Sequence, residues 1–225
     1  MLNLDDVLKD YGVIKHIPHA SISFPSNSGV HYNMSTNLKL SDLFIDILFK
    51  DIKGIEIKAP YSRLYCDVEK YQDNNLEEMY RFGMGYIYTK DIFTGEDIKR
   101  NHFDEEKNKI DEYYQNHHNR LLIETHQILA KGKKVLILDL HSFSEEYASL
   151  IGKKGPYPDI CIGVNNNQPY DSKILELIIN IIKEKGYSYQ INYPFSGAIL
   201  PNGLTNEEKD KVTSIMLEVN KRIYL

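Results

Sequence analysis

Runs and alternations of apolar residues predict the strands of this chain. Residues 11–17 (YGVIKHI) read as a strand that ends at Pro18, where the missing N–H and fixed φ interrupt pairing. The strongest pattern is residues 133–142 (KKVLILDLHS), which is apolar on both faces. Such a strand is usually covered by helices on both sides, so we expect it to be central and mainly parallel to its neighbours. Residues 159–164 and 188–193 are further strand candidates.

Helical spacing of apolar residues accounts for most of the remaining chain. A long helix is predicted over residues 104–131, ended by Gly132, and another over residues 172–186. Residues 40–52 predict a helix with Ser41 as its N-cap. The last stretch, residues 206–225, is acidic at its start and basic near its end, which suits the macrodipole of a helix.

Strands that alternate with long helices predict an α/β fold. We expect a three-layer arrangement with a mixed, mostly parallel central sheet and helices on both faces. Residues 54–71 predict two extended pieces around Pro60, while residues 26–37 are polar and read as a loop. The chain has 225 residues, which suits one domain over residues 1–225.

Net charge, apolar run length and cysteine content argue against several classes of function. The net charge of -5 gives no basic surface for phosphates, so nucleic acid is not expected as a partner. The apolar runs are too short to span a bilayer, and the start of the chain lacks a signal peptide pattern, so we expect a cytoplasmic protein without membrane contact. Only Cys66 and Cys161 are present, without a CxxC pair, so any metal ion would need histidine and carboxylate ligands.

Two histidines stand where predicted strands end. His19 follows the first strand, and His141 ends the strongest strand two residues after Asp139. Reactive groups of open α/β sheets gather at the carboxyl ends of the strands, so these histidines could converge. Asp139 could accept a hydrogen bond from a metal-bound imidazole.

Each of these residues also has a plainer interpretation. Lone histidines are usually polar surface residues, and His16, His31, His102 and His126 are assigned to that role. A third metal ligand would have to come from elsewhere in the chain. Asp42 and Asp46 are the nearest candidates, although two carboxylates one turn apart can also be an ordinary solvated helix face.

Eight segments together resemble the N-formylglutamate amidohydrolase family. They occur in the family's order and approximate spacing, from about Pro18 to Tyr224: PHASISFP, LSDLFIDILF, YSRLYCDVEK, YYQNHHNRLL, VLILDLHSFS, PDICIGV, YPFSGAIL and LEVNKRIY. That family is similar to the zinc carboxypeptidases and to aspartoacylase in fold and site. The resemblance therefore implies a carboxypeptidase-like α/β fold and an amidohydrolase activity.

The resemblance also implies one zinc ion and its ligands. Its two histidine ligands fall on His19 and His141, and its acidic ligand falls on Asp42 or Asp46. Asp42 is favoured because related carboxypeptidases place their ligand glutamate at a helix start. Two imidazoles and one carboxylate leave a zinc position open for water.

Other positions match residues around the site of the family. Glu218 matches the catalytic glutamate, and Arg63 matches an arginine that polarises the scissile carbonyl. The remaining matches are expected to bind or surround the substrate: Asp67, Lys70, His118, Asn192, Phe195 and Gly197.

The chain departs from the family at two places. Many relatives carry Asn-Arg where this chain has Glu69-Lys70, and that pair would hold a free carboxylate of the substrate. Lysine keeps the charge but loses the two-pronged guanidinium, and Glu69 is expected to repel a carboxylate. Ile22 also replaces the glycine expected after the first motif.

These matches predict a zinc-dependent hydrolase that cleaves the C–N amide bond of a small N-acylated, N-formyl amino acid-like substrate with metal-activated water. Two alternatives stay open: a catalytically altered metal-binding protein of the same fold, and an amidase or peptidase that acts on peptide or cell-wall amides. The expected partner is a small N-acyl amino acid or a short peptide. A nucleotide-binding protein is not supported, since no GxGxxG or GxxxxGK[ST] motif follows a strand.

Overall fold

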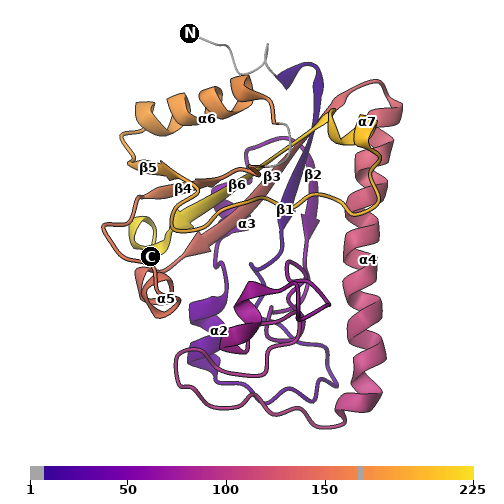
Figure 1. Ribbon diagram of the computed structural model, residues 1–225, viewed down its shortest axis with the longest axis vertical. Coiled ribbons are helices and arrows are strands. Elements are labelled where there is room, and N and C mark those ends of the chain that lie inside the picture. The colour runs from indigo at the N-terminus through magenta and orange to yellow at the C-terminus, as the bar shows by residue number, and fades with distance from the viewer. Residues whose placement is uncertain (1–7, 167–169) are drawn as a thin grey trace.

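The computed structural model describes residues 8–166 and 170–225, and a six-stranded sheet runs through its centre (Figure 1). The strands are β1 (Tyr11–Ile17), β2 (Ile55–Lys58), β3 (Lys134–Phe143), β4 (Ile160–Gly163), β5 (Tyr189–Ile191) and β6 (Val212–Asn220). Their order across the sheet is β2-β1-β3-β6-β4-β5. All neighbours are parallel except β4 and β6, so the predicted mixed, mostly parallel sheet is confirmed.

Helices cover both faces of this sheet. The long helix α4 (Phe103–Ala130) packs through Leu121 and Ile128 against Val135 and Ile137 of β3. On the other face, α6 (Ser172–Glu184) and the short α3 (Ile45–Leu48) share a core with the alternate residues of β3 and β6. Figure 1 shows α4 running the length of the molecule beside the sheet. The expected three-layer α/β fold is therefore confirmed.

β3 is the central strand that its sequence predicts. It pairs with β1 on one side and β6 on the other, and every residue after Lys134 is buried. A strand in this position needs apolar side chains on both faces, which is the pattern of KVLILDL.

The predicted C-terminal helix over residues 206–225 is wrong. Its acidic start forms only α7 (Asn206–Lys209), capped by Thr205 and Glu208 in a capping box. The following run is β6, which lies between β3 and β4 and is buried at every position. Terminal charges suited a helix, but VTSIMLEV carries apolar and small side chains on both faces, as an interior strand requires.

The predicted helix over residues 40–52 is also largely wrong. Ser41 is not its N-cap but the C-cap of an earlier helix, α2 (Met34–Leu40), whose start lies in the stretch expected to be a loop. Phe44 has a φ of 65°, which separates α2 from the four residues of α3. Asp42 consequently lies in a turn between two helices.

Residues 59–102 form a separate layer of turns beyond the carboxyl end of β2. The second extended piece expected after Pro60 is not a strand, and the regular element here is the 3₁₀ helix η1 (Glu78–Phe82). Aromatic residues such as Tyr65 and Tyr88, together with aliphatic residues such as Val68, give this region its own core. Among the described residues, no helix has the length and apolar character needed to cross a lipid bilayer.

Candidate active site

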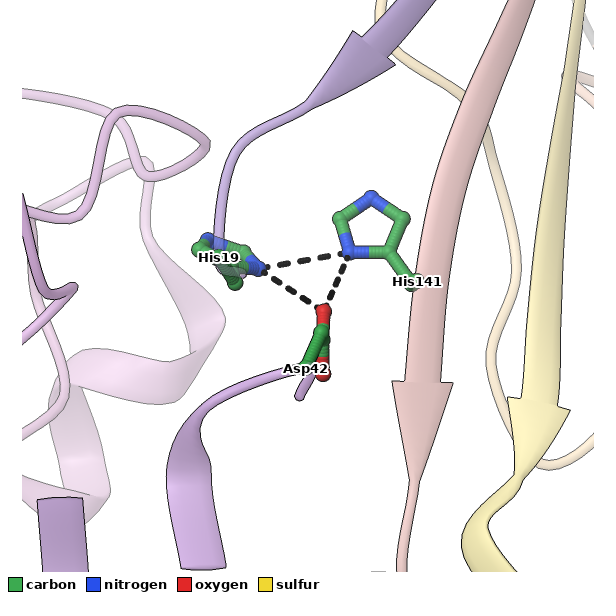
Figure 2. Close-up of side chains that lie close together, drawn as sticks. All are labelled: His19, Asp42 and His141. Atoms are coloured by element: carbon green, nitrogen blue, oxygen red, sulfur yellow. Dashed lines mark hydrogen bonds and ion pairs between the residues drawn. The ribbon is translucent and has the colours of Figure 1, made fainter. Parts of the chain in front are cut away.

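Two histidines and one aspartate meet at the carboxyl ends of β1 and β3 (Figure 2). His19 follows β1, His141 lies near the end of β3, and Asp42 lies between α2 and α3. The two Nδ1 atoms are 3.3 Å apart, and Asp42 Oδ2 is 3.3 Å from His141 Nδ1 and 3.6 Å from His19 Nδ1. All three side chains are buried at the base of a cavity, and we call them the open group.

The backbone brings the open group together from distant parts of the chain. β1 and β3 are parallel neighbours, so their carboxyl ends reach the same edge of the sheet. The Asp42 N–H donates to the His19 carbonyl at 2.9 Å, which ties the turn after α2 to the end of β1. Ser142 Oγ donates to Asp42 Oδ1 at 3.0 Å, so Oδ2 is the oxygen left facing the imidazoles.

Carboxylates fix both imidazoles from behind. His19 Nε2 lies 2.8 Å from Asp67 Oδ1, and His141 Nε2 lies 3.0 Å from Asp139 Oδ1. In a neutral imidazole, the nitrogen that donates to a carboxylate carries the proton, and the other nitrogen presents a lone pair. In that tautomer, Nδ1 is the nitrogen that each ring can offer to a metal ion beside Asp42 Oδ2.

The donor set of the open group suits a tetrahedral metal ion. Ligands about 2.0 to 2.2 Å from a tetrahedral zinc lie about 3.3 to 3.6 Å from one another. The observed separations are 3.3, 3.3 and 3.6 Å. Buried Asp42 Oδ2 has no hydrogen-bond partner within the described ranges. Although burial alone would raise it, His141 and His19 hold the pKa of Asp42 well below its usual range.

Glu218 lies on β6 directly opposite His141 in the β3–β6 register. It lines the same cavity, and its buried Oε2 has no hydrogen-bond partner in the part of the chain that the structure describes. Burial raises the pKa of Glu218 to about 8 against the attraction of His141. A carboxyl group that titrates near neutral pH can both accept and donate a proton.

Arg63 reaches the cavity from the loop after β2. Its Nη2 and Nε donate to Asp67 Oδ2 at 2.8 and 3.1 Å, and the Tyr88 hydroxyl donates to the same oxygen at 2.7 Å. The other oxygen of Asp67 faces His19. Asp67 thus joins the guanidinium to the His19 imidazole and is not itself part of the cavity lining.

The cavity above the open group has a volume of about 600 Å³. Phe195 forms part of its wall and stacks on Tyr147, with ring centroids 6.0 Å apart. Lys70 also lines it, but its Nζ lies 3.4 Å from Glu77 Oε1. A cavity of this size matches those that bind small molecules.

Four buried or half-buried polar residues, His16, Glu69, His117 and Asp139, form a second group behind the first. His16 Nδ1 is 2.8 Å from Asp139 Oδ1 and 3.2 Å from Glu69 Oε1, and His16 Nε2 is 2.8 Å from His117 Nε2. Although burial alone would lower it, Asp139 and Glu69 raise the pKa of His16 to about 9. Burial, helped by the charge of His16, lowers the pKa of His117 to about 2. His16 is therefore an imidazolium that donates on both sides, and we call these residues the closed group.

Glu69 takes part in this closed group instead of standing free in the cavity. Its Oε2 lies 3.4 Å from His141 Nε2 while its Oε1 faces His16. Two imidazoles therefore compensate the negative charge that the sequence suggested would repel a substrate carboxylate.

Several predicted site residues are not brought to the cavity. Asp46 on α3 forms an ion pair with Lys58 at the end of β2 and does not join the open group, which separates it from Asp42. His118 lies 2.8 Å from the Val68 carbonyl through Nε2. Neither Asn192 nor Gly197 lines the cavity; both have positive φ values, 57° and 86°, and shape the loop that carries Phe195.

Sequence reasoning missed the closed group. His16 was assigned to the surface, yet its side chain is fully buried, and His117 was passed over for its neighbour His118. The signal for His16 was present in the alternation of β1, because His16 shares a face with buried Ile14. The other three histidines of that assignment, at positions 31, 102 and 126, are exposed or half-buried.

Together, the fold and the site define an α/β protein with a histidine–carboxylate donor group at its strand ends, an arrangement typical of metal-assisted hydrolases. The family model of N-formylglutamate amidohydrolase matches residues 11–225. The chain therefore belongs to the N-formylglutamate amidohydrolase family, and the protein is an amidohydrolase. The resemblance seen in its motifs is confirmed.

Solved structures agree with this assignment at the level of the fold. The crystal structure of an N-formylglutamate amidohydrolase from Ralstonia eutropha JMP134 has a TM-score of 0.80 at 19% identity, covering 95% of this chain and 83% of the other. The structure of a gene product from Agrobacterium tumefaciens has a TM-score of 0.64 at 17% identity, covering 95% and 81%. No match was found among curated proteins.

Proposed function

We propose that this protein is a zinc-dependent hydrolase of a small N-acylated amino acid, with an N-formyl amino acid as the simplest substrate. The observation that carries the proposal is the open group, in which two Nδ1 atoms and a carboxylate oxygen lie 3.3 to 3.6 Å apart at the base of a small-molecule cavity. Membership of an amidohydrolase family supplies the reaction class.

His19, Asp42 and His141 would hold the metal ion. When bound, zinc polarises a carbonyl group and activates water for attack. Asp67 and Asp139 keep both imidazoles in the tautomer that leaves Nδ1 free, and Ser142 fixes the carboxylate through its other oxygen. This support turns three side chains, one from strand β3 and two from loop segments, into a rigid donor set.

Glu218 is the proposed general base and acid. It would accept the proton of the attacking water at its free Oε2 and deliver it to the departing nitrogen. Its place opposite His141 on the neighbouring strand keeps the carboxyl group beside the metal ligands. A bound cation would lower its pKa from about 8, which favours the ionised form that takes the first proton.

Arg63 is the proposed stabiliser of the developing oxyanion. Asp67 holds its Nε and Nη2, which fixes the plane of the guanidinium at the cavity wall. A preorganised cation of this kind stabilises charge that forms in the transition state without reorganising. Phe195 and Tyr147 would exclude water from the acyl side of the substrate.

Metal content and turnover of the same preparations test this function. Purified protein should contain about one zinc per chain by plasma mass spectrometry, and should release formate from N-formyl-L-glutamate or a related N-formyl amino acid. Removing zinc with a chelator should abolish turnover, and adding zinc should restore it. A panel of N-formyl, N-acetyl and N-succinyl amino acids and short acyl peptides would identify the acyl group.

Two substitutions sharpen the test. His19→Ala should lose both zinc and turnover, because it removes one ligand of three. Asp46→Asn is the matched control, since Asp46 pairs with Lys58 outside the cavity and should keep both. Stoichiometric zinc in the His19→Ala protein would refute the proposed centre.

A further inference from the structure

Lys221 places an ammonium group in the wall of the active-site cavity. The residue opens η2 (Lys221–Ile223), directly after β6 and three residues beyond Glu218. Its Nζ donates to the Lys39 carbonyl at 2.6 Å and to the Ser41 carbonyl at 2.8 Å. Because Ser41 precedes Asp42, the ammonium is held in a fixed place next to the proposed metal ligands.

No carboxylate of the described residues lies at ion-pair distance from this ammonium, and Asp42 and Glu218 attract it only from farther away. Three other cations that line the cavity each pair with a carboxylate: Lys39, Arg63 and Lys70. No ion pair of Lys221 occurs within residues 8–166 and 170–225, where its partners are two neutral carbonyls. An ammonium has three N–H donors, so one remains available to the cavity.

Lys153 is the other cavity cation without an ion pair in the described ranges, but its side chain is exposed and has no fixed partner. An exposed charge is screened by water and contributes little to binding. Lys221 is partly buried and held by two hydrogen bonds, so it is the better preorganised of the two.

The position that the family resemblance assigns to a carboxylate clamp is already occupied by internal pairs. Lys70 faces Glu77, and Glu69 is held between two imidazoles of the open and closed groups. The positive charge of Lys70 is therefore already compensated by Glu77, and Glu69 is itself an anion. A substrate carboxylate would instead find a positive charge at Lys221, which the Lys39 and Ser41 carbonyls hold in the wall of the same cavity.

We propose that Lys221 binds a carboxylate of the substrate and so sets the preference of the enzyme for N-acyl amino acids with a free acid group. The inference rests on the proposed function, because it takes the cavity above the open group as the substrate site. Its chemistry is a charge-assisted hydrogen bond from the free N–H of the ammonium to a carboxylate oxygen.

Binding can be measured without turnover in zinc-loaded Glu218→Gln protein. Isothermal titration with N-formyl-L-glutamate, its α-amide and its γ-amide compares ligands that differ by one carboxylate. Lys221→Met in this background should weaken N-formyl-L-glutamate binding about 10- to 100-fold, the range expected for a hydrogen bond between charged groups. It should leave unchanged the binding of the one monoamide that lacks the recognised carboxylate.

Control variants separate recognition from support of the nearby turn. Lys221→Arg keeps the charge and should retain affinity within about fivefold, whereas Lys221→Met should retain full zinc content. Lys153→Met removes the exposed cavity cation and should change affinity by less than about threefold. These three results together assign the effect to a fixed positive charge at position 221.

Other outcomes would overturn the inference. Unchanged affinity of Lys221→Met for N-formyl-L-glutamate would exclude a carboxylate contact. Equal weakening of all three ligands, or loss of zinc, would show that Lys221 only supports the Ser41–Asp42 turn. Absence of hydrolysis in the wild-type protein, with carboxylate-dependent binding intact, would refute the proposed function while leaving this subsite standing.

Discussion

Two groups of histidines and carboxylates are adjacent in this protein, and they differ more in the distances between their facing atoms than in residue composition. In the open group, the facing atoms of His19, Asp42 and His141 are 3.3 to 3.6 Å apart. In the closed group, His16 lies 2.8 Å from Asp139 on one side and 2.8 Å from His117 on the other. Asp139 belongs to both arrangements, because it also faces His141.

This difference decides what each group can hold. Short contacts of 2.8 Å are hydrogen bonds, so protons on His16 already fill the closed group. Facing nitrogen and oxygen atoms about 3.3 Å apart leave room for a cation between them. The same residue types therefore leave room for a metal ion in one place and form a charged hydrogen-bonded network in the other.

The largest expected effect is on zinc stoichiometry. His141→Ala should lose zinc and at least about a thousandfold of turnover, because a three-ligand site depends on each ligand. His16→Leu should still bind one zinc per chain, measured by plasma mass spectrometry after dialysis. A second tightly bound equivalent in the wild type, lost in His16→Leu, would show that the closed group also holds a metal.

Glu218→Gln should separate the metal from the chemistry of the open group. The amide cannot take the proton of water, so kcat should fall about a hundredfold to ten-thousandfold while zinc content stays at the wild-type value. Stopped assays of formate release, paired with metal analysis of the same sample, measure both quantities. Wild-type turnover in this variant would remove Glu218 from the mechanism.

His16→Leu should destabilise the protein by about 3 kcal/mol, because it leaves Asp139 and Glu69 without their buried cation. Urea unfolding of the zinc-loaded proteins measures this loss. His126→Leu is a matched control, since His126 is half-exposed and faces Glu208 at 3.3 Å, and it should cost less than about 1 kcal/mol. Similar losses in the two variants would contradict the charged closed group.

The stabilisation by His16 should depend on pH. Its pKa rises from 6.5 in the unfolded chain to about 9 in the folded protein, so folding favours the protonated ring. The difference in unfolding free energy between wild type and His16→Leu should be full below about pH 6.5 and should decline as pH rises through about 9. An increase of this difference over the same range would show that His16 is neutral in the native state.

Much of the fold could be predicted because local patterns agreed with the tertiary structure. The strand KVLILDL and the helix over residues 104–131 were found from apolar spacing alone, and both form close to where they were expected. The C-terminal stretch was misassigned because charges at its ends favoured a helix, while burial between β3 and β4 favoured β6. Tertiary pairing outweighs such terminal charge preferences, which contribute only about 0.3 to 1 kcal/mol.

The open group was within reach of the sequence, since strand ends and family motifs pointed to His19 and His141. The choice between Asp42 and Asp46 could not be made from the sequence, because it depends on the break between α2, which ends at Ser41, and α3, which begins after Phe44. That turn directs Asp42 toward the imidazoles and leaves Asp46 with Lys58.

By itself, the sequence determined the central strand, the layered α/β fold and the histidines at the strand ends, because these depend on local periodicity and motif. Only the tertiary structure decided that His16 is a buried cation, that imidazoles compensate the charge of Glu69, and that Lys221 forms no ion pair among the described residues. Those properties depend on which charges lie within about 4 Å across the fold, and sequence spacing carries no information about such distances.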